Sequence, residues 1–435
     1  MTNSAIVQSD KKMELLNRSA WKTKLFLVGL VFLFFSRILV AIGFPSLIDF
    51  FHYFYFAVIF FYNFFIDALE KKLSGIQKFI VGLWLFLICT TILNQVGLIN
   101  AIISCLTISQ PFILIYFCKG IHRAELEKFL NFVFLANAIF AYVEYFILGY
   151  RVDNVKGIFL NMGAGHHICG AVAIIAMIYY FCKFRKTLFK VFPILFQFFV
   201  VFFCDNKQSL FVFVCAFIVM ALFGRVRFKK KLALIFAGIV LCIGIYILGR
   251  ASFPAILTYL NFDRLYYGLE AKFSVFSYLS QKTNLFSDLF GFGAGMTVSR
   301  TAQNLVNYKF LQNFGATISD LQNAIWQLQE SNWRTNSITG SSMFSLYFSY
   351  AGFYGDFGLV GLLLILFGYI KYIIKGTKSF ANQLLIIYFL LHGLIFQWLE
   401  EPQFVAAVIL CREILNYIYQ KQQIERKQKY AVSYQ

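Results

Sequence analysis

The sequence has few charged residues. Only 14% of its 435 residues are Asp, Glu, Lys or Arg, whereas 60% are apolar and Phe alone occurs 56 times. A soluble globule of this length would need many more polar side chains to cover its surface. Apolar runs of about 17–22 residues recur instead, which is the length that a helix needs to cross a membrane. The sequence therefore predicts an all-α polytopic membrane bundle and argues against a soluble helical array.

The sequence also lacks clusters of metal-ligating or pairing residues. None of its nine cysteines belongs to a CxxC pair, and none lies in residues 250–342. We therefore expect no disulfide, no structural metal and no cofactor. A cleavable signal peptide is not expected either, because the first apolar run is too long and has no small-residue cleavage site.

The apolar runs predict about a dozen membrane spans. They lie at 25–43, 47–66, 79–96, 98–118, 129–149, 167–182, 188–204, 209–223, 232–249, 343–370, 383–399 and 403–420. This gives a first group of nine spans within 25–249, a long connection at 250–342 and three spans within 343–420. Residues 1–24 and 421–435 form the tails. Glycines along the tenth span suggest that its first part, 343–353, is re-entrant or interfacial.

The basic residues predict the orientation of these spans. Most of the 39 Lys and Arg residues lie in the two tails and in every second connection, which the positive-inside rule assigns to the cytoplasm. Residues 150–166 and 250–342 then face outward. The net charge of +19 is thus explained by topology, and a nucleic-acid partner is not expected.

The long outward connection has helical patterns on either side of a glycine-rich turn. Leu265, Leu269, Phe273 and Phe276 share one helical face. Ser319-Asp-Leu-Gln322 is typical of a capping box that opens a second helix. Both helices could lie on the bilayer surface or cap the bundle. Between them, Gly291-Phe-Gly-Ala-Gly295 is a turn rather than a phosphate loop, because no strand precedes it and no Lys-Ser/Thr follows.

Four short segments resemble motifs of the Wzy-type O-antigen and capsule repeat-unit polymerases, which are relatives of the O-antigen ligases. They are Lys156-Gly-Ile-Phe-Leu-Asn161, Asp205-Asn-Lys-Gln-Ser209, Phe290–Gly295 with Ser299-Arg-Thr-Ala302, and Asp356-Phe-Gly-Leu-Val-Gly361. Their order and the span layout, with one long outer loop late in the sequence, match that family. The Arg-to-Gly spacings described for some polymerases are not met.

The resemblance implies a C-type membrane glycosyltransferase in the bacterial inner membrane, with both termini cytoplasmic. Its substrates would be oligosaccharide repeat units on undecaprenyl diphosphate. A hydroxyl of one unit would attack the anomeric carbon of the growing chain, and undecaprenyl diphosphate would leave. Membrane lipid and a chain-length regulator protein are the other expected partners.

Positioned Arg and Lys can stabilise a leaving diphosphate. On this basis we expect catalytic roles for Arg300 and Arg334. His166 is expected to be catalytic as a base for the acceptor hydroxyl, because His can titrate near neutral pH. The expected diphosphate or sugar binders are Lys207, Arg151, Lys156 and Arg264, and the further candidates are Asp205, Asp356 and Glu400. Two of these residues also suit a plainer role: His166 fits an interfacial helix start, and Lys207 fits snorkelling to the membrane surface.

Neighbouring charged residues have more ordinary interpretations. We expect Lys272 and Lys282 to be solvated or paired with nearby acids, Arg37 to pair with Asp49 or snorkel, and Glu401 to stabilise a helix N-terminus.

Two other functions remain as alternatives. An O-antigen ligase would carry a His beside Asn, Ser or Gln upstream of its Gly-x-x-Gly, and residues 344–349 contain no His. A repeat-unit flippase would have short outer loops and charges inside its spans, whereas these spans are nearly free of charge.

Overall fold

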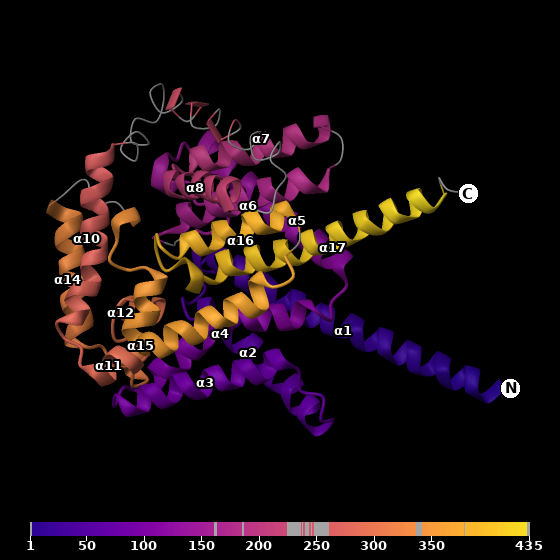
Figure 1. Ribbon diagram of the computed structural model, residues 1–435, viewed down its shortest axis with the longest axis horizontal. Coiled ribbons are helices and arrows are strands. Elements are labelled where there is room, and N and C mark those ends of the chain that lie inside the picture. Colours follow the sequence, from indigo (N-terminus) through magenta and orange to yellow (C-terminus); the bar gives the residue numbers. More distant parts are fainter. Residues whose placement is uncertain are drawn as a thin grey trace. The chain divides into compact units, whose positions relative to one another are not determined.

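The computed structural model describes residues 2–160, 163–184, 187–223, 261–335, 342–377 and 379–432, and scattered positions between 236 and 247. Every regular element in these ranges is helical (Figure 1). Seven helical stretches are long and apolar enough to cross a membrane: Trp21–Ala41, Ile48–Leu69, Gly75–Leu93, Leu98–Cys118, Arg123–Ile147, Gly165–Lys183 and Ser349–Ile374. The all-helical membrane class is therefore supported. The prediction of twelve spans remains a prediction, and 232–249 falls mostly outside the described residues.

The chain divides into two compact units, which we describe separately. Unit 1 comprises 1–73, 111–204 and 409–435, and unit 2 comprises 74–110 and 205–408. The boundaries between the units fall inside two helices, α4 (Leu98–Cys118) and α17 (Pro402–Val432), so each unit contains part of both helices.

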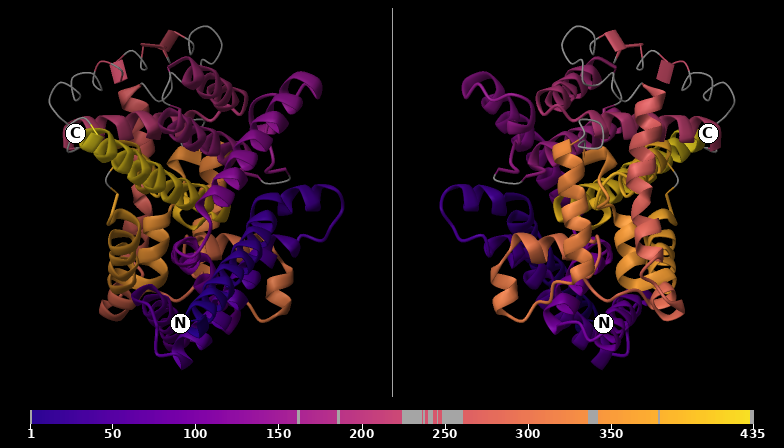
Figure 2. Two further views of the ribbon diagram at one scale, coloured as in Figure 1. Left: turned by 90° about the vertical axis from the view of Figure 1, so that its right-hand side faces the viewer. Right: turned by 90° about the vertical axis from the view of Figure 1, so that its left-hand side faces the viewer.

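Unit 1 is built from apolar helices that pair along the sequence. Its elements are α1 (Thr2–Ala41), α2 (Ile48–Leu69), α5 (Arg123–Tyr142), a π-helical turn η1 (Val143–Ile147), a 3₁₀ turn η2 (Val152–Asn154), α6 (Gly165–Lys183) and α7 (Thr187–Phe203). Figure 2 shows α1 and α2, in dark indigo and violet, packed along each other. The core between helices is aromatic; Phe26, for example, contacts both Phe56 and Phe117.

Unit 2 carries the long connection and the late spans. Its elements are α3 (Gly75–Leu93), α8 (Lys207–Phe223), α10 (Phe262–Ser280), α11 (Leu285–Phe290), α12 (Arg300–Asn307), α13 (Phe310–Asn313), α14 (Asp320–Thr335), η4 (Ser342–Phe344), α15 (Ser349–Gly368), η5 (Tyr369–Ile374), α16 (Phe380–His392) and η6 (Trp398–Glu400). Figures 1 and 2 show α10 and α14 side by side. Val275, Ile325 and Tyr347 share one core there.

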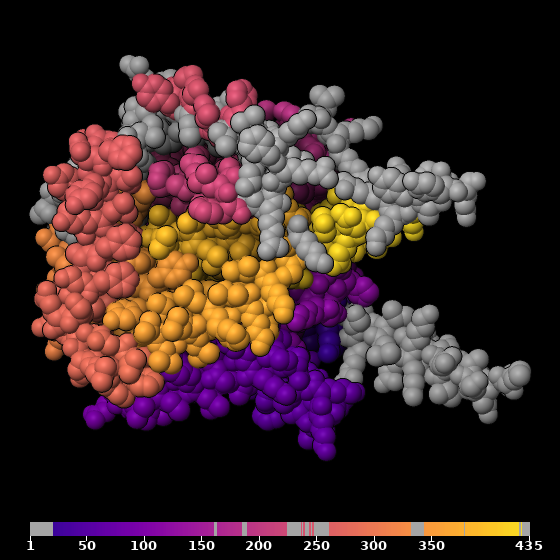
Figure 3. Space-filling view, in the orientation of Figure 1, coloured from indigo at the N-terminus to yellow at the C-terminus, as the bar shows by residue number. Residues whose placement is uncertain are grey.

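The long connection thus contains the two predicted helices, but α10 buries a different face from the one its apolar pattern suggested. Gly268, Lys272, Val275 and Leu279 are buried, whereas Phe273 on the apolar face is 43% exposed. Figure 3 shows α10, in salmon, at the surface of its unit. The pattern identified an apolar face without saying whether protein or lipid covers it.

The predicted cap of α14 is half confirmed. Ser319 Oγ accepts the Gln322 N–H at 2.9 Å, as an N-cap should. The Gln322 side chain does not return to Ser319; it donates to the Ala302 carbonyl at 2.6 Å and ties α14 to α12.

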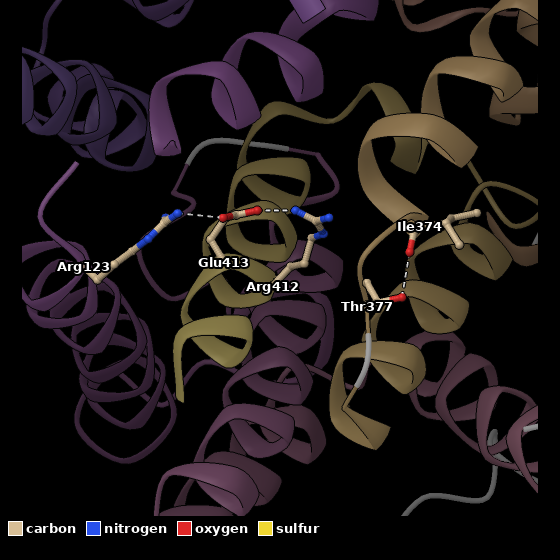
Figure 4. Close-up of polar contacts among 5 residues, drawn as sticks. All are labelled: Arg123, Ile374, Thr377, Arg412 and Glu413. Atoms are coloured by element: carbon tan, nitrogen blue, oxygen red, sulfur yellow. Dashed lines mark hydrogen bonds and ion pairs between the residues drawn. The ribbon is translucent and has the colours of Figure 1, made fainter. Parts of the chain in front are cut away.

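The last spans are shorter or less regular than their apolar runs. Helix α15 begins at Ser349, after the η4 turn, rather than at residue 343, and it is interrupted at Gly358, where φ is +66°. Helix α16 ends at His392, and a turn leads from it into η6. After η5, Thr377 Oγ1 donates to the Ile374 carbonyl at 2.7 Å (Figure 4).

Candidate functional site

The glycine turn of unit 2 encloses a buried carboxylate. Asp356, on α15, is fully buried; one of its oxygens accepts the Gly295 N–H at 2.7 Å, and the other accepts the N–H and the hydroxyl of Thr297 at 2.9 and 2.7 Å. Such a concave set of backbone N–H groups is what an anion site needs. Here the protein's own Asp356 fills it, so Asp356 has a structural role.

Close packing explains why this part of the sequence is rich in glycine. Gly291, Gly293 and Gly295 all have positive φ, which glycine adopts without steric cost. A Cβ on Gly291 would overlap the backbone of Asp356, and a Cβ on Gly355 would overlap the side chain of Thr297. Gly352, Gly355 and Gly358, which had suggested a re-entrant segment, are therefore the surface of α15 on which residues 289–299 lie.

Arg300 follows this turn at the first position of α12 and faces a pair of glutamates. Its backbone N–H donates to Glu400 Oε2 at 2.9 Å. Its guanidinium forms an ion pair with Glu401 Oε2 at 2.8 Å and donates to Gln303 Oε1 at 2.8 Å. The Arg300 side chain is only 13% exposed. Three residues singled out from the sequence, Arg300, Asp356 and Glu400, thus meet within one unit.

Glu400 is the member of this group that keeps acceptor capacity. It is 1% exposed, and its Oε1 has no hydrogen-bond partner within the described residues. Burial raises the pKa of Glu400 well above its ordinary value; the nearby charges of Asp356 and Glu401 add to this, whereas Arg300 opposes it. A carboxyl group with these properties takes up a proton more readily than an exposed glutamate does.

Glu401 has a partner that the sequence did not predict, because its side chain pairs with Arg300. Glu401 also directly precedes α17, which Pro402 opens. The neighbouring Gln397 donates to the Val298 carbonyl at 2.6 Å, so both glutamates lie on a segment that is fixed to the residues just before α12.

Lys272 corrects the expectation that its side chain is solvated or paired with nearby acids. It is 1% exposed rather than solvated, and its Nζ donates to the carbonyls of Met343, Ser345 and Ile395 at 2.8–3.1 Å. Burial lowers the pKa of Lys272, while three carbonyl acceptors favour the charged form. Lys272 therefore anchors α10 to two loops, and only Lys282 is exposed as expected.

The short turn before α8 has its charges paired internally. Lys207 Nζ lies 2.5 Å from Asp205 Oδ2, and both side chains are largely buried. In the same helix, Ser209 Oγ lies 3.1 Å from His392 Nε2, and His392 Nδ1 lies 2.9 Å from the Tyr388 carbonyl. This buried Ser–His contact joins α8 to the end of α16.

The loop 150–166 of unit 1 is organised by a glutamate that the sequence pattern did not single out. Glu144 Oε2, in η1, accepts the N–H groups of Lys156 and Gly157, both at 2.7 Å. Glu144 is 3% exposed, and its other oxygen has no partner among the described residues.

The other residues of this loop are engaged locally. His166 Nε2 lies 3.4 Å from Asp153 Oδ1. Arg151 donates to the Tyr145 and Tyr150 carbonyls at 2.6 and 2.8 Å and lies over the Tyr145 ring. The backbone of Lys156 and the side chain of Arg151 are thus both fixed by hydrogen bonds within or next to this loop.

Two further candidates lie in the helices of the long connection. Arg264 is in the first turn of α10 and is exposed. Arg334 is in the last turn of α14, but its side chain lies outside the described residues. No contact brings Arg264 to the Arg300 group in the described part of unit 2.

Unit 1 contains two other buried charged groups. Arg37 pairs with Asp49 at 2.7 Å, as expected. Figure 4 shows Glu413 between Arg123, at 3.0 Å, and Arg412. Both groups join helices, α1 to α2 and α5 to α17.

The polar residues that sequence reasoning missed have one signal in common. Glu144 and His392 lie inside apolar runs, where an ionisable side chain is costly and tends to have a specific partner. Within the described ranges, no group of three or more His, Cys, Asp or Glu side chains could hold a metal ion.

Comparisons with known proteins give no relative. No family model, curated protein or solved structure matches the chain. A proposal about its function therefore rests on its own residues.

Proposed function

We propose that this protein is a glycosyltransferase that joins undecaprenyl-diphosphate-linked oligosaccharide repeat units at the outer face of the inner membrane. One observation carries the proposal: Arg300, which directly follows the glycine turn that Asp356 holds, donates its backbone N–H to the half-satisfied Glu400 of η6. A cation and a proton acceptor are the two groups that this reaction uses.

In the reaction, an acceptor hydroxyl oxygen forms a bond to the anomeric carbon of the donor. The bond from that carbon to the phosphate oxygen breaks, and the diphosphate leaves with the electron pair. Arg300 stabilises the leaving charge, because guanidinium binds phosphate oxygens in a bidentate way and remains charged when buried. Without substrate, the guanidinium of Arg300 forms an ion pair with Glu401. Glu400 accepts the hydroxyl proton.

The remaining candidates would bind substrate. In unit 2, Arg334, Lys207 and Arg264 are proposed contacts for diphosphate or sugar, and Asp205 would orient Lys207. In unit 1, Arg151, Lys156 and His166 are proposed as a separate set of such contacts. A chain-length regulator is a further proposed partner.

Gene deletion with complementation tests the proposal. Loss of a polymerase leaves single repeat units on the surface lipid, or no capsule, whereas loss of a ligase leaves bare core and polymer on the carrier lipid. Arg300→Ala and Glu400→Gln should both fail to restore long polymer, and Lys282→Ala, an exposed charge change, should restore it. Full-length polymer with Arg300→Ala would overturn the assignment.

A transporter is the second candidate, because Asp356 and Glu144 are buried carboxylates within apolar helices. The same deletion separates the two functions. A missing flippase leaves no repeat unit on the outer surface, whereas a missing polymerase leaves single units there.

A further inference from the structure

A cavity in unit 1 lies outside all the groups described above. It has a volume of about 200 Å³ and is formed by α1, by the second half of α2 with Glu70, and by Phe117 of α4. The residues that line it are Trp21, Lys22, Leu25, Ile59, Tyr62, Asn63, Ile66, Asp67, Glu70 and Phe117.

The cavity lies at the ends of two candidate spans. One span begins at Trp21 and the other ends at Leu69, so the charged lining residues Lys22, Asp67 and Glu70 are at headgroup level. Trp21 and Tyr62 are 62% and 66% exposed, as aromatic residues at a membrane interface often are. The Lys-rich connection that follows α2 belongs to the side that the positive-inside rule assigns to the cytoplasm.

The lining combines an apolar wall with charges of both signs. Leu25, Ile66 and Phe117 offer a surface for acyl chains, while Lys22 on one side and Asp67 with Glu70 on the other provide one cation and two carboxylates. Phosphate oxygens suit a lysine, and carboxylates suit an ammonium group that can donate hydrogen bonds.

We propose that this cavity binds a phospholipid with a primary amine headgroup, of the phosphatidylethanolamine class. Lys22 contacts its phosphate, and Asp67 and Glu70 contact its ammonium. Asp67 already accepts the Tyr116 hydroxyl at 3.0 Å, which fixes the carboxylate, and a carboxylate accepts several hydrogen bonds at once. Glu70 contacts Lys72 at 3.0 Å in an exposed pair, which a ligand ammonium can replace at small cost.

The chemistry distinguishes three headgroups. Ethanolamine donates N–H hydrogen bonds to the carboxylates. Choline has no N–H, although its cation can lie against Trp21 or Tyr62. Glycerol phosphate brings a net negative charge, which the two carboxylates repel.

Lipid titration of the purified full-length protein, followed by native mass spectrometry, tests the site. With identical acyl chains, we expect phosphatidylethanolamine to bind at least about threefold more than phosphatidylcholine or phosphatidylglycerol. Asp67→Asn with Glu70→Gln should remove this preference. Lys22→Ala should weaken ethanolamine and choline lipids alike, because both carry the phosphate.

Glu125→Gln is the matched control, since it removes an exposed acid from the first turn of α5 in the same unit. It should leave the lipid preference unchanged, and gel filtration should show all variants folded. Equal binding of the ethanolamine and choline lipids would overturn the proposal. Preferential binding of phosphatidylglycerol would also overturn it and would indicate a site governed by Lys22.

Discussion

Each unit contains a loop that is held by a buried carboxylate, but the two carboxylates differ in how far they are satisfied. Glu144 accepts two backbone N–H groups on one oxygen and leaves the other without a partner in the described residues. Asp356 receives donors on both oxygens. A fully satisfied buried acid holds a backbone, whereas a half-satisfied one retains acceptor capacity. Like Glu144, Glu400 is half-satisfied and retains acceptor capacity on one oxygen.

The glycines of the two loops differ as well. Gly157 in unit 1 and Gly291 in unit 2 both have positive φ and no room for a Cβ. A Cβ on Gly157 would overlap mainly the side chains of Asn137 and Cys169, and side chains can shift. A Cβ on Gly291 would overlap the backbone of Asp356, which cannot shift. The Asp356 loop should therefore be the less tolerant of the two.

Alanine at these glycines tests that difference and should give the largest effect. Gly291→Ala adds overlap with backbone to the strain of positive φ and should cost more than about 3 kcal/mol, enough to lose most folded protein. Gly157→Ala should cost less. Gly315→Ala is the control, because Gly315 has φ +90° but open space around it, and it should cost about 1 kcal/mol. Thermal unfolding in detergent measures all three.

Equal losses at Gly291 and Gly315 would show that φ alone decides the cost. The distinction between the two loops would then fail.

Much of the fold could be predicted from local pattern. Apolar runs gave the helices α1 to α6, and Ser319 marked the start of α14. The face that α10 buries could not be predicted, because an apolar stripe on a membrane protein suits lipid as well as protein. Lys272 shows the same limit: its three acceptors come from loops about 70 and 120 residues away in sequence.

The candidate site was predictable only in part. Arg300, Asp356 and Glu400 were each identified as outward polar residues, but their grouping depends on pairings across 60–100 residues that a single sequence does not reveal. Glu144 carried a usable signal, since an acid within an apolar run needs a partner. The partner itself, a pair of backbone N–H groups, has no signature in sequence.

Amide substitutions test the carboxylate comparison directly and should have a smaller effect. In Asp356→Asn, an NH₂ group replaces one oxygen and faces backbone donors, so about 2 kcal/mol of stability should be lost. In Glu144→Gln, the amide oxygen can keep both N–H groups while the NH₂ takes the place of the unpartnered oxygen. The cost should stay below about 1 kcal/mol. Thermal unfolding of the two variants measures the difference, and a larger loss for Glu144→Gln would contradict the comparison.

The smallest expected effect is the pH dependence that Glu400 confers. Because burial raises the pKa of Glu400, the folded protein binds more protons than the unfolded chain once the pH exceeds its ordinary value of 4.5. The contribution of Glu400 to stability is complete below that pH and is lost as the pH rises through the raised pKa. As the pH rises above about 5, the apparent melting temperature of the wild type should therefore fall relative to that of Glu400→Gln. Glu125→Gln, which removes an exposed carboxylate, should follow the wild type. If wild type and Glu400→Gln gave parallel curves, Glu400 would take up no extra proton on folding in this range, and its role as a proton acceptor would be overturned.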